Sequence, residues 1–200
     1  MLWTVGHSTR TVEALVELLR AHGIRCLADV RTLPRSRRNP QFNADALPRP
    51  LDAVGIRYAH LPDLGGLRHA RPDSPNTAWR DPGFRGYADH MQTAVFAAAL
   101  DELLAVAARA PTAVMCAEAV PWRCHRLLLS DALVAGGEPV AHIRSADAAD
   151  PHALTSWARV DGMRVTYPGP PELFSRGEGH APMPGRARRG VARGRRGARS

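Results

Sequence analysis

The chain has 200 residues, of which 44% are hydrophobic, and a formal net charge of +8. This length suffices for one domain with a well-formed core. No apolar run approaches the length of a membrane span, and the first five residues lack a signal-peptide pattern, so we expect no membrane contact. Three cysteines are too few for a disulfide framework, which favours a cytoplasmic protein.

The positive charge is concentrated at the C-terminal end. Residues 176–200 hold eight arginines and one acidic residue, whereas residues 1–175 hold nineteen arginines and eighteen acidic residues. The end of the chain is rich in Gly, Pro and Arg, a composition that cannot supply a core. We therefore predict a single α/β domain over residues 1–170 and a disordered basic tail over residues 171–200, which could bind nucleic acid through its phosphates.

Strand and helix patterns alternate in the first part of the chain. An apolar run over residues 2–6 predicts a buried strand, and residues 12–21 follow with the apolar spacing of a helix that a glycine ends. A second strand is expected over residues 26–30. A short helix is expected in the latter part of residues 46–54, because two prolines restrict its start, and a third strand over residues 57–61.

The second part of the chain repeats this alternation after a long loop. Residues 62–83 are rich in Gly, Pro, Asp and Asn, and a loop of this length is often a lid or a binding loop. The strongest helix pattern covers residues 87–108, and a fourth strand covers residues 113–116. A helix over residues 124–135 and a fifth strand over residues 140–143 complete the series.

These elements predict an α/β fold with a mainly parallel sheet of about five strands and helices on both faces. Residues 158–167 differ, because Asp161-Gly162 between apolar pairs is typical of a hairpin, which we place at the C-terminal edge of the sheet.

Polar residues follow each predicted strand. In open α/β sheets ligands bind at the carboxyl ends of the strands, so these residues are expected to meet at one edge. A further group, Cys124-His125-Arg126, opens the helix after the fourth strand. The residues that end or follow the strands are His7, Ser8, Asp29, Arg31, Arg35, His60, Gly65, Gly66, Cys116, Glu118 and His142.

Several short motifs of the chain resemble a known family, the prokaryotic proteins grouped as domain of unknown function 488. The resemblance runs from about Leu2 to Tyr167 and implies a compact α/β domain of the prokaryotic cytosol whose activity is not established. The motifs that carry it are Gly6-His7-Ser8, Asp29-Val30-Arg31, Pro34-Arg35-Ser36, Leu64-Gly65-Gly66, Phe84 through Tyr87, Cys116-Ala117-Glu118 and Cys124-His125-Arg126.

The arginines at the strand ends indicate an anion-binding pocket. The planar guanidinium of arginine pairs with phosphate or carboxylate through two parallel hydrogen bonds. We expect a small anionic or phosphorylated ligand here. The predicted substrate-binding residues are His7, Ser8, Arg31, Arg35, Arg126, His60, Gly65 and Gly66.

The predicted catalytic residues are Cys124, His125, Glu118, Cys116 and Asp29. Cys124 lies beside cationic side chains and is expected in the first turn of a helix, an arrangement that favours the thiolate. The carboxylates can act as acid or base, and the imidazole can shuttle a proton near neutral pH. A buried structural thiol is the alternative interpretation for each cysteine.

A metal site is the third interpretation of the cysteines. Cys116, Cys124 and His125 could form a Cys/Cys/His set, but seven residues separate the two cysteines, which is outside the short spacing of zinc knuckles. We therefore expect no metal and no cofactor. His22, His69, His90, His152 and His180 stand outside any cluster and are expected at the surface.

Two functions from different classes follow. The favoured one is an enzyme that acts on a phosphorylated or anionic substrate, such as a nucleotide or nucleic acid, through a Cys/His/Glu/Arg pocket. The alternative is a non-catalytic module that binds nucleic acid through the basic tail. Neither the substrate nor the oligomeric state follows from the sequence.

Overall fold

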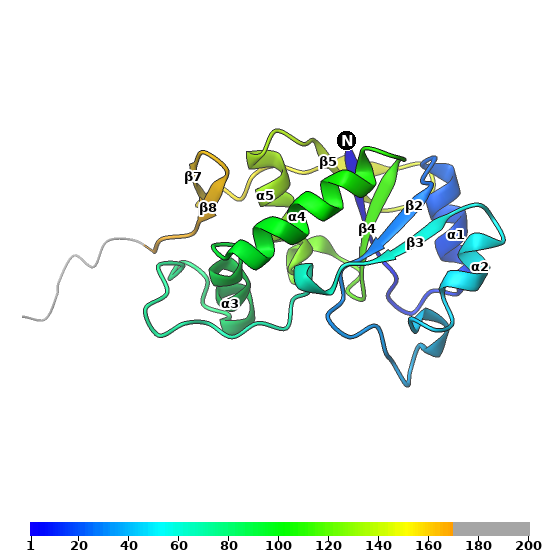
Figure 1. Cartoon of the computed structure of the whole chain (residues 1–200), viewed down its shortest axis with the longest axis horizontal. Helices are drawn as coiled ribbons and strands as arrows, with labels where there is room; N and C mark the ends of the chain where they lie inside the picture. Colours follow the sequence, from blue (N-terminus) through cyan, green and yellow to red (C-terminus); the bar gives the residue numbers. More distant parts are fainter. Residues whose placement is uncertain (170–200) are drawn as a thin grey trace, which may run out of the picture. The chain divides into compact units, whose positions relative to one another are not determined.

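A six-stranded sheet forms the centre of the protein in the computed structural model, which describes residues 1–169. The strand order is β3-β2-β4-β1-β5-β6. Figure 1 labels β3, β2, β4 and β5 of this sheet. The first five strands are parallel and β6 pairs antiparallel with β5, which confirms the predicted mainly parallel sheet. The strands are β1 (Leu2–Gly6), β2 (Cys26–Asp29), β3 (Arg57–His60), β4 (Thr112–Cys116), β5 (Val140–Ile143) and β6 (Ala149–Pro151).

The register of the sheet brings the carboxyl ends of the strands together. Gly6 of β1 lies beside Cys116 of β4, and Asp29 of β2 lies beside His60 of β3. Beyond β1 the backbone continues alongside β4, because the His7 amide donates to the Cys116 carbonyl at 3.0 Å. The polar residues after β1, β2 and β4 therefore share one edge of the sheet.

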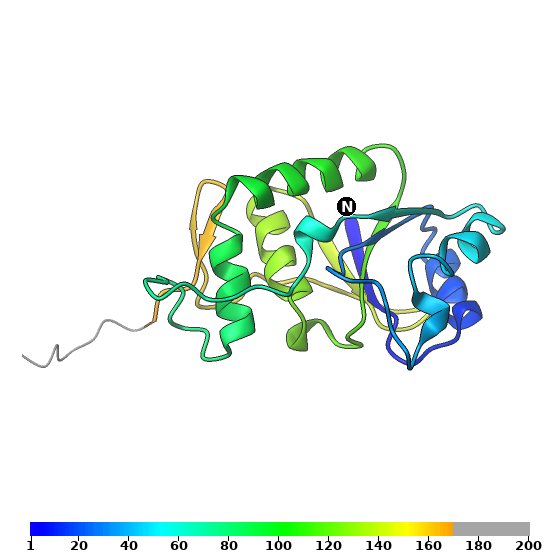
Figure 2. The same ribbon diagram turned by 60° about the horizontal axis from the view of Figure 1, so that its bottom comes forward.

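Helices cover both faces of the sheet, as predicted (Figures 1 and 2). Helices α1 (Val12–Ala21) and α2 (Pro48–Asp52) pack on one face. Helices α3 (Pro82–His90), α4 (Ala94–Ala107) and α5 (Arg126–Ala135) belong to the core on the other face. Side chains of a strand alternate between faces, so Leu27 joins the first core and Ala28 the second.

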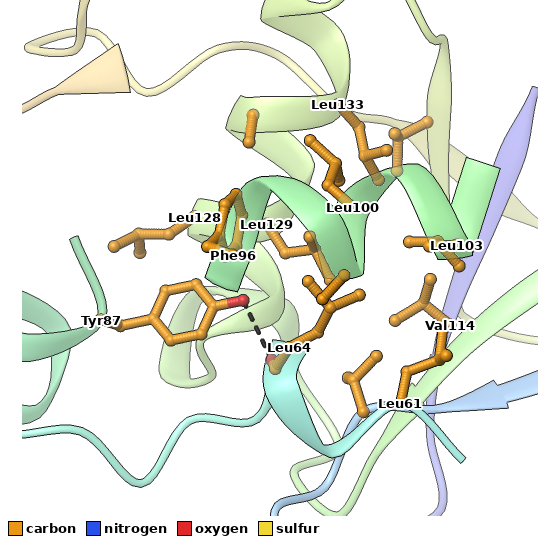
Figure 3. Close-up of a cluster of buried hydrophobic side chains, with 14 of the residues drawn as sticks. Leu61, Leu64, Tyr87, Phe96, Leu100, Leu103, Val114, Leu128, Leu129 and Leu133 are labelled. Atoms are coloured by element: carbon orange, nitrogen blue, oxygen red, sulfur yellow. Dashed lines mark hydrogen bonds between the residues drawn. The ribbon is translucent and has the colours of Figure 1, made fainter. Parts of the chain in front are cut away.

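The larger core supports the region beneath the strand ends (Figure 3). Tyr87 of α3 is fully buried among leucines of α4 and α5, and its hydroxyl donates to the Leu64 carbonyl at 3.0 Å. Burial of each such side chain contributes about 2 kcal/mol to folding. Leu64 ends the short 3₁₀ turn η2 (Pro62–Leu64), so the core fixes the start of the long loop.

The prediction of a single helix over residues 87–108 is wrong, because the structure has two helices in this region, α3 and α4. Asp81 caps α3, accepting from the amides of Gly83 and Phe84, so this helix begins earlier than predicted. Thr93 accepts from the Phe96 amide at 3.2 Å and donates to the His90 carbonyl at 2.7 Å. These bonds end α3 and begin α4 within one turn.

The start of the helix expected over residues 124–135 is also corrected. The chain passes through the 3₁₀ turn η3 (Pro121–Arg123) and extended backbone at Cys124, and α5 begins at Arg126. Cys124 therefore precedes the helix, and its environment is set by neighbouring side chains instead of by a helical first turn.

Most of the long loop after β3 is fastened to α3. The buried Asp89 carboxylate accepts from the Arg71 amide at 2.8 Å, from the Ser74 hydroxyl at 2.6 Å and from the Asn76 amide group at 2.8 Å. The Asn76 side chain in turn accepts from the Tyr167 amide at 2.9 Å. These hydrogen bonds hold the middle of the loop against α3.

The predicted hairpin forms a sheet of its own. Strands β7 (Arg159–Asp161) and β8 (Arg164–Thr166) pair antiparallel, and β8 contacts α5. The expected hairpin is confirmed, but it does not extend the edge of the main sheet. That edge is strand β6. The sequence did not predict β6, because it has only three residues, one of them a proline, and shows no alternation of apolar and polar side chains.

The predicted basic tail, including residues 176–200, lies outside the described residues, so its state and any contact with nucleic acid stay predictions. Across residues 1–169, each helix is too short or too polar to cross a lipid bilayer.

Candidate functional site

A compact cluster of two thiols and one imidazole lies at the carboxyl ends of the strands. Cys116 is the last residue of β4, and Cys124 and His125 lie between η3 and α5. His125 Nδ1 is 3.7 Å from Cys124 Sγ and 3.9 Å from Cys116 Sγ. The three atoms lie within 4.8 Å of one another, and both cysteines are buried. We call these three residues the Cys–His cluster.

The imidazole of the cluster is held by packing. Its ring centroid lies 5.0 Å from that of Tyr87, and a side chain at Gly66 would overlap the ring. His125 Nε2 is buried and lacks a hydrogen-bond partner among residues 1–169. The polar contacts of the ring are therefore those of Nδ1 with the two sulfurs.

Arg126 lies beneath the cluster and is almost completely buried. Its Nε donates to Cys124 Sγ at 3.4 Å, while its terminal nitrogens donate to Thr4 Oγ1 at 3.3 Å and to the Glu118 carbonyl. Within the described part of the chain, no carboxylate pairs with this guanidinium. A buried charge without a counter-charge costs several kcal/mol, so a thiolate at Cys124 is the natural partner of Arg126.

The two thiols differ in acidity. A hydrogen bond from Cys116, followed by the His125 ring and the Arg126 charge, lowers the pKa of Cys124 to about 3. The same interaction with Cys124, together with burial, raises the pKa of Cys116 well above its usual range. These effects favour a negative charge on Cys124, beside Arg126, over one on Cys116.

A chain of hydrogen bonds continues from Arg126 into the protein. Thr4 Oγ1 lies 2.7 Å from His142 Nδ1, His142 Nε2 lies 3.0 Å from His152 Nδ1, and His152 Nε2 lies 2.9 Å from an Asp131 oxygen. Burial lowers the pKa of His142 to about 4, so this ring is neutral near pH 7. Each group can donate to the next, ending at the carboxylate of Asp131.

Two histidines expected at the surface are therefore placed differently. The His152 side chain is almost fully buried in this chain of hydrogen bonds. His90 is also buried, and its Nε2 lies 2.7 Å from the Asp63 carbonyl. The residues that they contact lie 10 to 27 positions away in the sequence, so no sequence motif groups them with these histidines.

A cavity of about 560 Å³ opens above the Cys–His cluster. Six predicted site residues line it, namely Arg31, Gly66, Cys116, Glu118, Cys124 and His125. Residues beyond those predictions complete the wall, namely Thr32, Leu33, Leu67, Asp81, Gly83, Phe84, Ala117 and Arg123. Asp81, Gly83 and Phe84 lie where the long loop ends and α3 begins. The length of this loop had predicted a lid or a binding loop.

Asp29 and His7 lie behind the cavity, around Arg31. Asp29 Oδ1 accepts from Arg31 Nε at 2.8 Å, and Oδ2 accepts from the Tyr58 hydroxyl at 2.7 Å. His7 Nε2 lies 3.1 Å from Arg31, and its ring stacks on Phe42. Burial lowers the pKa of His7 to about 4. These contacts fix Arg31 in the cavity wall, and the catalytic role predicted for Asp29 stays a prediction.

The remaining predicted binding residues also lie outside the cavity lining. Ser8 has a positive φ of 50°, which strains the turn after β1. The Arg35 side chain is exposed, and His60 Nε2 lies 2.9 Å from the Arg31 carbonyl. Gly65 packs closely against Thr32. Their contact with a substrate stays a prediction.

Comparison with known families identifies the chain. A family model described as "Domain of unknown function DUF488" matches residues 11–133, more than half of the chain. The chain belongs to the DUF488 family. No curated protein and no solved structure matches it. The match confirms the resemblance drawn from the sequence motifs and includes the whole Cys–His cluster.

The DUF488 site has the groups for two kinds of chemistry. A thiolate beside a buried guanidinium can act as a nucleophile or as a metal ligand. The cluster offers two sulfurs and one imidazole nitrogen to a metal ion. Glu118 and Arg123, which are both exposed, line the same cavity as these groups.

Proposed function

We propose that this DUF488 protein is an enzyme that acts on a phosphorylated or otherwise anionic substrate in the cavity above the Cys–His cluster. The observation that carries the proposal is the buried, carboxylate-free Arg126 in contact with Cys124 Sγ. A buried positive charge of this kind stabilises a thiolate at Cys124, which lines the cavity.

The cavity wall supports an anionic substrate. Arg123 is exposed on the wall and makes no ion pair with the residues of the described range. Arg31 and Thr32 line the same cavity. Arginine suits phosphate and carboxylate groups because its planar donors match two oxygens at once.

Glu118 supplies the proton-transfer group of the proposed site. Its side chain is exposed and lines the cavity, while its carbonyl accepts from Arg126, which fixes the backbone at this point. A positioned carboxylate of this kind typically contributes about 100-fold or more to a reaction with proton transfer. The Cys–His cluster is the reactive centre beside it.

The proposal is tested by turnover of a panel of anionic compounds. Sugar phosphates, nucleotides and a short oligonucleotide are incubated with the full chain, and products are identified by mass spectrometry. We expect turnover of a member of the panel, with losses of about 100-fold or more in Glu118→Gln and Cys124→Ser. Cys26→Ala is the matched control, because Cys26 is buried at the start of β2.

A binding measurement complements turnover. Calorimetric titration of the active compound should show weaker binding to Arg123→Ala by about tenfold, the effect of one lost charge-assisted hydrogen bond. Arg109→Ala, which removes an exposed arginine after α4, should bind as the native chain does. Equal affinity of the two variants, or no turnover across the panel, contradicts the proposed function.

A further inference from the structure

We infer that Cys116, Cys124 and His125 bind one zinc ion through their two Sγ atoms and Nδ1, with the fourth ligand position open to the cavity. The inference deepens the proposed function, on which it rests only for the role of the ion as reactive centre. The sequence spacing had favoured the absence of a metal, whereas the folded chain brings the three atoms together.

The distances in the cluster fit a tetrahedral ion. Zinc bonds of about 2.3 Å to sulfur and about 2.0 Å to nitrogen place the two ligand atoms about 3.6 Å apart. His125 Nδ1 lies 3.7 Å from Cys124 Sγ and 3.9 Å from Cys116 Sγ. Both nitrogen-to-sulfur distances are therefore within a few tenths of an ångström of those in a tetrahedral zinc site.

The ligand types select zinc over the hard cations. Magnesium and calcium prefer oxygen ligands, whereas two sulfurs and one imidazole form one of the known three-ligand zinc sites. The seven-residue spacing of the cysteines is compatible with this site because η3 turns the chain back. The Cys124 amide donates to the Pro121 carbonyl at 3.0 Å, which returns Cys124 to the end of β4.

The surroundings of the imidazole also favour a metal bond. His125 Nε2 is buried and has no partner in the described range, so Nδ1 carries all the polar contacts of the ring. Those contacts are with sulfur at 3.7 and 3.9 Å, and sulfur is a weak hydrogen-bond partner. A zinc ion bound to Nδ1 would replace these two weak contacts with a metal–nitrogen bond.

Neighbouring groups orient the ligands. Arg126 Nε donates to Cys124 Sγ, which offsets part of the thiolate charge around the ion. Gly66 and Tyr87 confine the His125 ring from two sides. Groups of this kind commonly change metal affinity by about 10- to 100-fold when they are replaced.

The open fourth position gives the ion a chemical role. Three protein ligands are typical of catalytic zinc sites, which leave one position for water or substrate. All three ligands line the cavity, together with Glu118 and Arg123. The ion would bind an oxygen of the anionic substrate or a water molecule, and Glu118 lies on the same wall to accept a proton.

The test measures metal directly, on the full chain without an added tag. We expect about one equivalent of zinc after purification and dialysis. Replacement by Co²⁺ should give sulfur-to-cobalt charge-transfer absorption and the visible bands of a tetrahedral ion. Cys116→Ser, Cys124→Ser and His125→Ala should each lose affinity by more than about 100-fold, whereas Cys26→Ala should retain the native spectrum and affinity.

Other outcomes overturn the inference. The inference fails if Co²⁺ still binds to all three variants, or if the native chain contains no metal. It also fails if protein purified without oxidant contains a Cys116–Cys124 disulfide. Circular dichroism establishes that each variant is folded, and Gly66→Ala offers a second perturbation that leaves all three ligands in place.

The zinc inference and the proposed function can fail separately. If chelated protein turns over the anionic substrate at the native rate, the role of the ion as reactive centre fails and the proposed function stands. If zinc is bound as expected but the panel is neither bound nor converted, the proposed function fails and the site is a structural zinc site.

Discussion

Gly66 sets how closely the long loop approaches the Cys–His cluster. A side chain at this position would overlap Nδ1 and Cγ of His125. We predict that Gly66→Ala folds with a loss of about 1–3 kcal/mol, the usual cost of overpacking, and that its ring moves away from the sulfurs. Urea unfolding measures the stability, and Co²⁺ absorption measures the cluster.

The control for this variant is Gly136→Ala, where an added methyl group meets only ordinary contacts at 3.4 Å or more. It should leave the cobalt spectrum unchanged. A native spectrum in Gly66→Ala would show that the contact does not position His125.

Asp29 illustrates a buried ion pair at the edge of a functional site. Its carboxylate is fully buried and holds Arg31, which reaches the cavity wall. We predict that Asp29→Asn lowers the free energy of unfolding by about 3–5 kcal/mol, because it leaves the Arg31 charge buried and unpaired. Denaturant unfolding checks this value, and the exposed Asp101→Asn serves as the control.

An unchanged stability in Asp29→Asn, together with a loss of turnover, would instead support the catalytic role predicted from the sequence. The two outcomes separate the structural and the catalytic interpretation of this residue.

At the scale of elements, Asp89 makes the attachment of the long loop to α3 dependent on pH. Burial alone would raise the pKa of Asp89, but hydrogen bonds from Ser74, the Arg71 amide and Asn76 outweigh it and lower the pKa. Because the folded pKa lies below the ordinary value of 3.8, the attachment contributes fully above that value. It weakens as the pH falls below that value and Asp89 becomes protonated.

Hydrogen exchange of the Arg71 amide, which donates to Asp89, measures this attachment. We predict that the Arg71 amide exchanges slowly at pH 6. After the exchange rates are corrected for their intrinsic dependence on pH, this amide should lose its protection as the pH falls below about 3.8. Asp89→Asn should exchange faster at pH 6 and lose most of the pH dependence. Protection that persists in Asp89→Asn would contradict the prediction.

The four buried parallel strands β1, β2, β4 and β5 were predictable because apolar runs identify buried strands. The break between α3 and α4 was not, because Thr93 lies within a continuous helical pattern and acts only through bonds to His90 and Phe96. Strand β6 depends on pairing with β5 and has no pattern of its own. Local composition thus predicts elements, whereas caps and edge pairings depend on contacts.

The same distinction applies to the site. Strand order brings together the residues after β1, β2 and β4, as the α/β pattern predicted, and the candidate site lies among them. Side-chain direction did not follow, since Asp29 and His7 face Arg31 behind the cavity. The chain from Thr4 through His142 to Asp131 joins residues far apart in the sequence, which no local pattern reveals.

At the scale of the molecule, two buried histidines make the fold sensitive to acid. Burial lowers the pKa of both His7 and His142 from 6.5 to about 4. The unfolded chain therefore binds more protons between pH 6.5 and 4, and stability falls as the pH falls through this range. We predict a loss of up to about 3 kcal/mol per histidine by pH 4, measured by urea unfolding across the range.

His142→Asn should remove about half of this pH dependence, whereas the exposed His69→Gln should leave it unchanged. A free energy of unfolding that is constant from pH 7 to 4.5 in the native chain would contradict the prediction.

The charge distribution offers a way to separate the proposed enzyme function from the predicted binding of nucleic acid by the tail. Residues 176–200 carry eight of the 27 basic residues, while residues 1–175 are nearly neutral. Affinity for nucleic acid that arises from phosphate contacts depends steeply on salt. We predict that a chain ending at residue 175 loses salt-dependent binding to a random oligonucleotide and keeps the zinc content and the turnover of the full chain.

Fluorescence anisotropy at several salt concentrations measures the binding, and the metal and turnover assays measure the cavity. If truncation leaves oligonucleotide affinity unchanged while Arg123→Ala abolishes it, the oligonucleotide binds in the cavity. Nucleic acid is then the favoured class of substrate. If truncation abolishes both binding and turnover, the tail delivers the substrate to the cavity, because electrostatic attraction raises the rate of encounter.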